Sequence, residues 1–456
     1  MSAAPVTWDD RLRDRWTDVF RADAFIHLAL LCAIVAATFQ GWLKDRVSGY
    51  GPYVLSDLFL IAAFLWWAGG LAARKSSIVG PRRTTALILV LVAVPALYLI
   101  LPGTPLVMEV AGLRAWSAFP VAALIALTVI RTPGQVRAYI GVVLVLCVVT
   151  ALYGIWQYRT GPQQALGISE LSQLRHGSTT FYGLGTAGER EFRAYSTFTF
   201  PAPFASMMVF GTILAAGVVA GRHARAWKRW LALLLLPLFF VGMTVSGTRA
   251  ALVTLLFGLL ILAWYRRLSW GQVLLIPVLA VALHVAVVLT SGRILERYQS
   301  LVVNEGILWR YAWAPITVAW RALQANLFGL GLGRSGVGVP FFVVNAQAPG
   351  FVVGSDGDIG RAAVEMGIVG VALLLLIVLG LLPAVARAVR VLRDAEADDV
   401  ALGAGALIGA TGLIILIGSP LSASPHALIW WILLGALLKL AMLRERGERE
   451  PAAAAS

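Results

Sequence analysis

The sequence predicts an all-α, polytopic membrane protein. Of its 456 residues, 59% are hydrophobic and only 13% are charged, and the mean hydropathy is +0.82. A water-soluble domain cannot bury that much apolar surface, so the bilayer must act as the solvent for most of the chain. Apolar stretches of about 20 residues, each long enough to cross a bilayer as a helix, recur along the whole sequence and predict about twelve spans.

The predicted spans and connections follow from these stretches. In chain order the spans are 24–41, 53–73, 84–101, 113–130, 138–158, 198–220, 230–246, 248–265, 270–290, 362–384, 400–418 and 426–443. Two connections are long, 159–197 and 291–360, and the second separates the ninth span from the tenth. The chain therefore divides into a leading segment 1–23, spans one to nine over 24–290, the loop 291–360, spans ten to twelve over 361–443, and a tail 444–456.

The basic residues predict the orientation of the spans. If the N-terminus is cytoplasmic, most of the 37 Lys and Arg residues fall in short cytoplasmic connections, and the two long loops face the periplasm. Both termini are then cytoplasmic. The net charge of +14 is explained by this topology and by attraction to anionic membrane lipid. Because the basic residues form no single patch on a soluble domain, nucleic acid is not an expected partner.

No motif in the sequence predicts a metal or a cofactor. Cys32 and Cys147 both lie in predicted spans, far apart in the chain, and form neither a disulfide framework nor a metal-binding spacing. The Gly-rich stretch 327–333 superficially resembles a nucleotide loop. It follows no predicted strand and opens no helix of a βαβ unit, so that interpretation is rejected.

Two arginines are predicted at the outer rim of the helix bundle. Arg193 comes shortly before a proline-rich helix start, and Arg249 follows the tight hairpin Ser246-Gly247-Thr248 between two apolar helices. Burying an arginine without an anion costs several kcal/mol, so each needs a protein carboxylate, a lipid phosphate or an anionic substrate. For Arg193 the alternative is snorkelling to lipid phosphate. For Arg249 we favour a bound substrate over a structural ion pair.

The second long loop contains an amphipathic pattern. Trp309, Trp313 and Trp320 recur at helical spacing within residues 307–321, and Arg310 lies off this stripe. The pattern predicts a helix that lies in the membrane interface with an aromatic belt, where it could also border a groove through which lipid enters.

Three carboxylates, Asp356, Asp358 and Glu365, cluster around Arg361 where this loop meets the tenth span. Arg361 and Glu365 are one helical turn apart and can pair. Asp358 is placed to cap the helix or to oppose its dipole. Asp356 has no comparable structural role, and a carboxylate near arginines can take the proton from an acceptor hydroxyl in a glycosyl transfer.

The order of these features resembles the O-antigen ligase and polysaccharide polymerase superfamily, over roughly residues 190–375. The matching motifs are Arg193 before a Pro-containing span, Ser246-Gly247-Thr248-Arg249-Ala250-Ala251-Leu252, Arg310 with Trp313, the stretch 327–333, and Glu365-Met366-Gly367-Ile368-Val369-Gly370. The resemblance implies a twelve-span, C-type glycosyltransferase-like architecture in the bacterial inner membrane. It also implies an undecaprenyl-diphosphate-linked glycan donor and inverting, metal-independent transfer at the periplasmic face.

Residue by residue, the resemblance implies roles for the candidates already named. Arg193 and Arg249, with Arg310 third, are expected to grip the diphosphate as it becomes the leaving group, and Arg361 is a further candidate for substrate binding. Asp356, Asp358 and Glu365 are the candidate catalytic carboxylates. The expected partners are the lipid-linked donor, a glycan or lipid acceptor, membrane lipids and a chain-length regulator.

One departure from the family pattern separates the possible activities. Members that act as lipid A–core ligases usually carry a His-Asn pair where this chain has Asp356-Gly357. This difference favours a polymerase that joins repeat units into O-antigen or exopolysaccharide, with a ligase using Asp356 as base as the alternative. A flippase or transporter of lipid-linked glycan would place its arginines near the bilayer midplane. A polyprenyl-monophosphate-sugar transferase would carry an acidic pair in the first outer loop, where this chain has the single acid Asp45.

Overall fold

The computed structural model describes residues 16–47, 51–73, 80–100, 106–161, 182–184, 190–267, 305–335, 357–416, 418 and 420–454. Helices dominate these residues, and the two strands, β1 (Tyr182–Leu184) and β2 (Arg190–Phe192), form one short antiparallel pair. The helices are α2 (Trp16–Thr38), α3 (Gln40–Arg46), α4 (Gly51–Ala72), α5 (Arg82–Leu97), α6 (Leu106–Leu113), α7 (Phe119–Val129), α8 (Pro133–Thr160), α11 (Pro201–Ala220), α12 (Ala226–Val245), α13 (Arg249–Arg266), α16 (Glu305–Ala325), α17 (Asp358–Leu376), α18 (Leu382–Leu392), α19 (Asp398–Leu413) and α20 (His426–Ala454).

Short helical turns of other types lie between some of these helices. They are the 3-10 turns η1 (Tyr98–Ile100) and η5 (Ile414–Leu416) and the π-helical turns η2 (Arg114–Ala118) and η4 (Ile377–Leu381). Turn η2 joins α6 to α7, and η4 joins α17 to α18, so each pair of helices forms one continuous span.

The predicted class, an all-α polytopic membrane protein, is confirmed. Within the described residues, nine helices are long and apolar enough to cross a membrane, and the count reaches ten if the bent pair α2–α3 is one span. The predicted span 270–290 lies outside these residues. The predicted span 400–418 corresponds to α19, which has only 16 residues and is buried along almost its whole length.

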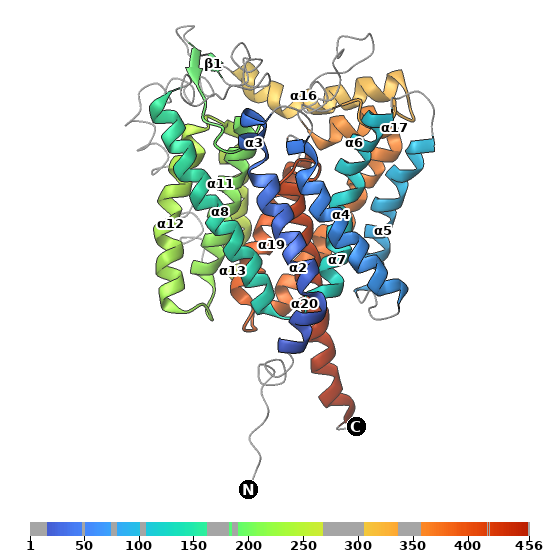
Figure 1. The fold of residues 1–456 in the computed structure, drawn as a ribbon, viewed down its shortest axis with the longest axis vertical. Coiled ribbons are helices and arrows are strands. Elements are labelled where there is room, and N and C mark those ends of the chain that lie inside the picture. Colours follow the sequence, from blue (N-terminus) through green and yellow to red (C-terminus); the bar gives the residue numbers. More distant parts are fainter. Residues whose placement is uncertain are drawn as a thin grey trace.

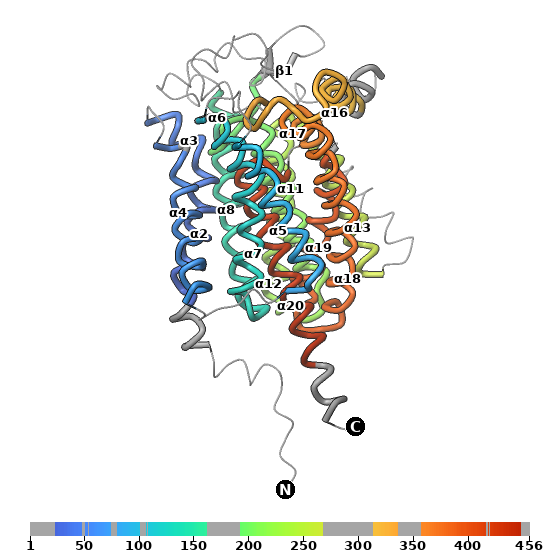
Figure 2. Tube along the Cα trace, turned by 90° about the vertical axis from the view of Figure 1, so that its right-hand side faces the viewer, coloured from blue at the N-terminus to red at the C-terminus, as the bar shows by residue number. Residues whose placement is uncertain are grey.

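The spanning helices run side by side, and α16 lies across one end of them (Figure 1). We call this end the α16 end, and the other the opposite end. Helix α16 includes the whole predicted interfacial segment 307–321. Its residues Trp313 and Trp320 are 42% and 62% exposed. Helix α3 lies at the α16 end as well, on the side of the bundle away from α16 (Figure 2).

Helix α20 occupies the middle of the bundle, where Trp430 and Trp431 are almost completely buried. Small residues let helices approach closely around it, as they commonly do in membrane proteins. A Cβ on Gly217 of α11 would lie 2.3 Å from the Cα of Gly403 in α19, and one on Gly435 of α20 would lie 2.4 Å from the carbonyl oxygen of Ala123 in α7.

Two helices extend beyond the predicted spans. The helix α17 begins at Asp358, four residues before the predicted span 362–384, and so includes Arg361, as the predicted pairing with Glu365 requires. The tail 444–456 is helical as far as Ala454, because α20 continues past the predicted end of the last span. The predicted hairpin at Ser246–Thr248 is confirmed, since α12 ends at Val245 and α13 begins at Arg249.

Candidate functional site

Arg193 is bound to the hairpin that joins α12 to α13. Its Nε donates a hydrogen bond to the carbonyl oxygen of Ser246 at 3.1 Å, and one terminal nitrogen donates to Oγ1 of Thr248 at 2.9 Å. The backbone NH of Ala194 donates to the carbonyl oxygen of Val245 at 3.1 Å. The planar guanidinium suits such a two-point contact, so Arg193 fixes the hairpin that starts α13.

Arg249 is the first residue of α13, directly after the contact point of Arg193. The chain turns into this helix through Gly247, whose φ of +58° is accessible to glycine at little cost. The fold therefore brings the two predicted diphosphate-binding arginines to one hairpin, although they are 56 residues apart in sequence. We call Arg193, Thr248 and Arg249 the arginine hairpin.

The segment that carries Arg193 is fastened on its other side to α8. The side-chain amide of Gln157 bonds both backbone groups of Ser196, accepting from its NH at 2.6 Å and donating to its carbonyl oxygen at 3.0 Å. Oγ of Ser196 donates to the carbonyl oxygen of Thr150 at 2.6 Å. Satisfied buried backbone groups hold this non-helical segment in one conformation inside the bundle.

Helix α17 is broken in the middle. Gly367 has φ +59° and ψ −140°, a conformation that is essentially restricted to glycine. The break frees backbone groups that an α-helix would satisfy internally, and the segment 327–331 and Tyr98 satisfy them instead. The bonds run from Leu330 N to Val364 O at 2.8 Å, from Gly331 N to Glu365 O at 3.1 Å, from Ile368 N to Leu327 O at 2.8 Å, and from the Tyr98 hydroxyl to Met366 O at 2.9 Å.

Glu365 lies next to this break with a fully buried side chain. Its carboxylate accepts hydrogen bonds from Nε of Arg361 at 3.0 Å, from Nε1 of Trp116 at 2.6 Å and from the backbone NH of Ser335 at 3.2 Å. The guanidinium of Arg361 also lies over the Trp116 ring, 5.6 Å from its centroid, within the range of a cation–π contact. We call these four residues the Glu365 cluster. The predicted pairing of Arg361 with Glu365 is confirmed.

Asp358 begins α17 and is completely buried. Its two carboxylate oxygens accept hydrogen bonds from the Ser422 hydroxyl at 2.6 Å and the Leu421 NH at 3.0 Å, and its own NH donates to the carbonyl oxygen of Gly418 at 2.9 Å. Asp358 thus fastens the connection between α19 and α20 to the start of α17.

That connection leads towards the segment that carries Arg193. It leads into His426 at the start of α20, whose ring centroid lies 6.2 Å from that of Phe198 and 5.1 Å from that of Phe210. Phe198 follows Arg193 by five residues on the fastened segment. A continuous packed path therefore joins Asp358 to the segment that carries Arg193.

Two predicted site residues cannot be placed by their side chains. Asp356 lies outside the described residues. Arg310 belongs to helix α16, but the position of its side chain is not among those that the structure describes. Among described residues, no group of three or more His, Cys, Asp or Glu side chains could hold a metal ion.

The sequence did not single out Trp116, Ser335 or Tyr98. Trp116 lies in the π-helical turn η2 between α6 and α7, and 249 positions separate it from its partner Glu365. π-helical turns are frequent at functional sites, but a sequence pattern does not reveal them. Only the tertiary structure brings these N-terminal spans to the site.

No protein-family model and no curated protein matches this chain.

Proposed function

We propose that this protein is a membrane glycosyltransferase that polymerises undecaprenyl-diphosphate-linked repeat units into O-antigen or exopolysaccharide at the periplasmic face of the bacterial inner membrane. The observation that carries the proposal is the arginine hairpin, where Arg193 binds the residue directly before Arg249. One arginine bonded to this turn and a second directly after it suit a diphosphate, which gains negative charge as it leaves.

The chemistry requires an attack by an acceptor hydroxyl on the anomeric carbon of the donor sugar. A base takes the hydroxyl proton, the new glycosidic bond forms with inversion, and the bond between the anomeric carbon and the phosphate oxygen breaks. The undecaprenyl diphosphate leaves with both bonding electrons. No metal takes part in this proposal, because the arginines supply the positive charge.

Within the proposal, the buried carboxylates and Asp356 take different roles. A base must reach the acceptor hydroxyl to within hydrogen-bonding distance. Asp358 and Glu365 are fully buried and already accept two and three hydrogen bonds, so we assign them the positioning of α17 and Arg361. We assign the base to Asp356, which precedes the start of α17 by two residues.

The position of the site supports an enzyme over a transporter. The arginine hairpin lies at one end of α12 and α13, and Arg361 lies in the first turn of α17 below the transverse helix α16. A transporter needs cationic sites near the bilayer midplane that can be reached from both faces. Sites at one end suit chemistry on a lipid head group at one membrane surface.

The test is a glycan profile of a deletion strain complemented with wild type, Arg249→Ala, Asp356→Asn or the control Arg225→Ala. Arg225 is exposed at the opposite end of the bundle. Loss of a charged donor to a leaving group, or of a general base, lowers rates by about 10²-fold or more. Arg249→Ala and Asp356→Asn should therefore leave single repeat units, while wild type and Arg225→Ala make long chains. Membrane levels of each variant are measured by immunoblot.

The same profile distinguishes the alternatives. Long chains that remain on the lipid carrier and are missing from their final acceptor would make the protein a ligase. An unchanged profile for Arg249→Ala and Asp356→Asn at normal membrane levels would overturn the glycosyltransferase proposal and favour a flippase or transporter.

A further inference from the structure

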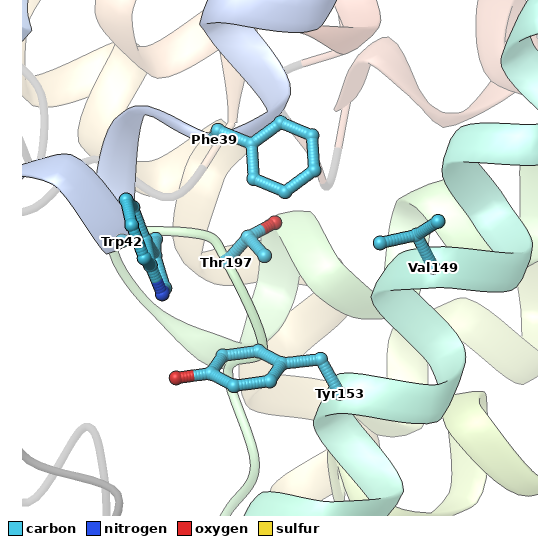
Figure 3. A pocket seen from close by; sticks show the side chains of 5 residues that line it. All are labelled: Phe39, Trp42, Val149, Tyr153 and Thr197. Atoms are coloured by element: carbon cyan, nitrogen blue, oxygen red, sulfur yellow. The ribbon is translucent and has the colours of Figure 1, made fainter.

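A cavity of about 420 Å³ lies between the α2–α3 bend and the C-terminal part of α8 (Figure 3). Its lining residues are Phe39, Trp42, Val149, Tyr153 and Thr197. Four of these five side chains are aliphatic or aromatic. The volume falls in the range of sites that bind small molecules, about 300–1,000 Å³, so the cavity can take one segment of an apolar chain.

The walls of the cavity are held in place by satisfied polar groups. The hydroxyl of Thr197 donates to the carbonyl oxygen of Thr38 at 2.7 Å, and the NH of Trp42 donates to the carbonyl oxygen of Thr197 at 2.9 Å. Gly41 permits this contact, since a Cβ there would lie 2.0 Å from the backbone carbon of Phe198. The 56° bend between α2 and α3 is thus fixed by the segment that carries Arg193.

The cavity borders the exposed apolar surface of a membrane-spanning helix. Val149 is 42% exposed, and its neighbours on α8, Val145 and Leu152, are 63% and 56% exposed. Helix α8 is apolar enough to cross the bilayer, so this exposed apolar surface contacts hydrocarbon and not water. A molecule that enters the cavity therefore comes from the hydrocarbon part of the membrane.

Positive charge lies on the elements that form the cavity. The guanidinium of Arg46 lies 4.2 Å from the centroid of the Trp42 ring and donates to the carbonyl oxygen of Trp42 at 3.3 Å. Arg193 precedes the lining residue Thr197 by four positions, which is at most about 15 Å of chain. A lipid whose chain lies in the cavity can present its phosphates to these two arginines.

We propose that this cavity binds the first isoprene units of a polyprenyl diphosphate, with the diphosphate at Arg46 and Arg193. The identity of the lipid rests on the proposed function, and the cavity adds where its chain is held. The methyl-branched, unsaturated chain meets the rings of Phe39, Trp42 and Tyr153, which offer large apolar faces at low entropic cost. Two arginines match two phosphates, whereas a phospholipid has one.

The test compares Val149→Trp with Val145→Trp. Both variants place a tryptophan at an exposed position of α8, and the two positions are one helical turn apart. Only Val149 lines the cavity. The full chain is purified in nanodiscs of phosphatidylethanolamine and phosphatidylglycerol with undecaprenyl diphosphate as the probe. Retained lipid is quantified by native mass spectrometry. Val149→Trp should lower the retained undecaprenyl diphosphate about tenfold, and Val145→Trp should match wild type.

Three results would overturn the proposal. They are the absence of retained undecaprenyl diphosphate on wild type, equal retention by Val149→Trp, and selective loss of phosphatidylglycerol from Val149→Trp. Thermal melting reports whether each variant is folded. If Val149→Trp does not fold, Val149→Phe replaces it, because phenylalanine is smaller and should also lower the retention of undecaprenyl diphosphate. The binding measurement needs no glycan and no transfer. If Val149→Trp alone loses undecaprenyl diphosphate, the binding role of the cavity is supported even if the glycan profile refutes the polymerase. If Val149→Trp retains as much undecaprenyl diphosphate as wild type, that role is refuted even if the polymerase is confirmed.

Discussion

At the scale of single residues, the Glu365 carboxylate decides where Arg361 points. Three donors from three parts of the chain converge on it, and none of its side chain is exposed. A buried charge is tolerated only when it is paired and hydrogen-bonded, and here the partner is a guanidinium that is itself 14% exposed. The pair therefore orients Arg361 and also joins α17 to the N-terminal spans through Trp116.

Glu365→Gln should destabilise the protein, because Arg361 would keep its buried charge without a counter-charge. Breaking one side of a buried ion pair costs about 3–5 kcal/mol, so the melting temperature of the detergent-solubilised protein should fall by several degrees.

The matched control is Glu445→Gln, which removes the ion pair between Glu445 and Arg387. This pair is much more exposed, with 31% of the glutamate side chain and 66% of the arginine side chain accessible to solvent. Exposed pairs contribute about 0–1 kcal/mol, so the control should melt close to wild type. Equal melting temperatures for both variants would refute the assigned role of Glu365.

At the scale of elements, the interruption of α17 is supported from outside the helix. A helix in the membrane can break only if its freed backbone groups find other partners, and here Leu327, Leu330 and Gly331 supply them. This arrangement couples the connection after α16 to the middle of α17. The Glu365 cluster depends on it, since Glu365 lies two residues before the break at Gly367.

Gly367→Ala should therefore disrupt the site. Its φ is positive, and a Cβ would lie 2.1 Å from the carbonyl oxygen of Leu327, a distance that real structures do not tolerate. We expect a loss of at least about 3 kcal/mol, combining backbone strain with orphaned hydrogen bonds, seen as poor recovery of monodisperse protein in size-exclusion chromatography.

Gly141→Ala in α8 is the control for this prediction, since a Cβ there meets nothing within 4 Å. Alanine is favoured over glycine in a helix by about 1 kcal/mol, so this variant should equal or exceed wild type in stability. Normal recovery of Gly367→Ala would show that the break is not required.

At the scale of the whole molecule, different bonds secure the two ends of the bundle. At the opposite end, Arg137 of α8 forms a two-point ion pair with Asp399 of α19, with both contacts at 3.0 Å. The neighbouring Asp398 accepts from the backbone NH groups of Arg222 and His223. These contacts tie α8, α11 and α19 together, whereas the α16 end carries the arginine hairpin and the Glu365 cluster.

The proposed orientation can be measured with reporter fusions. Truncations after Thr160, at the α16 end, should give active alkaline phosphatase, because this enzyme folds only in the periplasm. Truncations after Arg222 or Arg267, at the opposite end, should give inactive phosphatase and a fluorescent green fluorescent protein, as the excess of basic residues there requires. The reverse pattern would place the candidate site in the cytoplasm and refute the proposed periplasmic chemistry.

The features that depend on local composition can be derived from the sequence alone. Hydropathy determined the class and located the helices, since crossing a bilayer imposes a minimum apolar length. Three local features were also predictable, because each depends on residues only a few positions apart. They are the Ser246–Thr248 hairpin, the helix of residues 307–321 and the pairing of Arg361 with Glu365. Helices α17 and α20 extend beyond the predicted spans, since hydropathy does not register polar residues that a helix buries or extends through.

How distant segments meet is visible only in the folded chain. Arg193 holds the hairpin of Arg249, Trp116 reaches Glu365, and Thr197 closes a cavity with Phe39 and Val149, each across tens to hundreds of residues. The break at Gly367 belongs to the same group, because its glycine is explained by the segment 327–331 that packs against it. Such contacts arise from how helices pack, and in a membrane nearly uniform apolar helix surfaces leave little trace of that packing in the sequence.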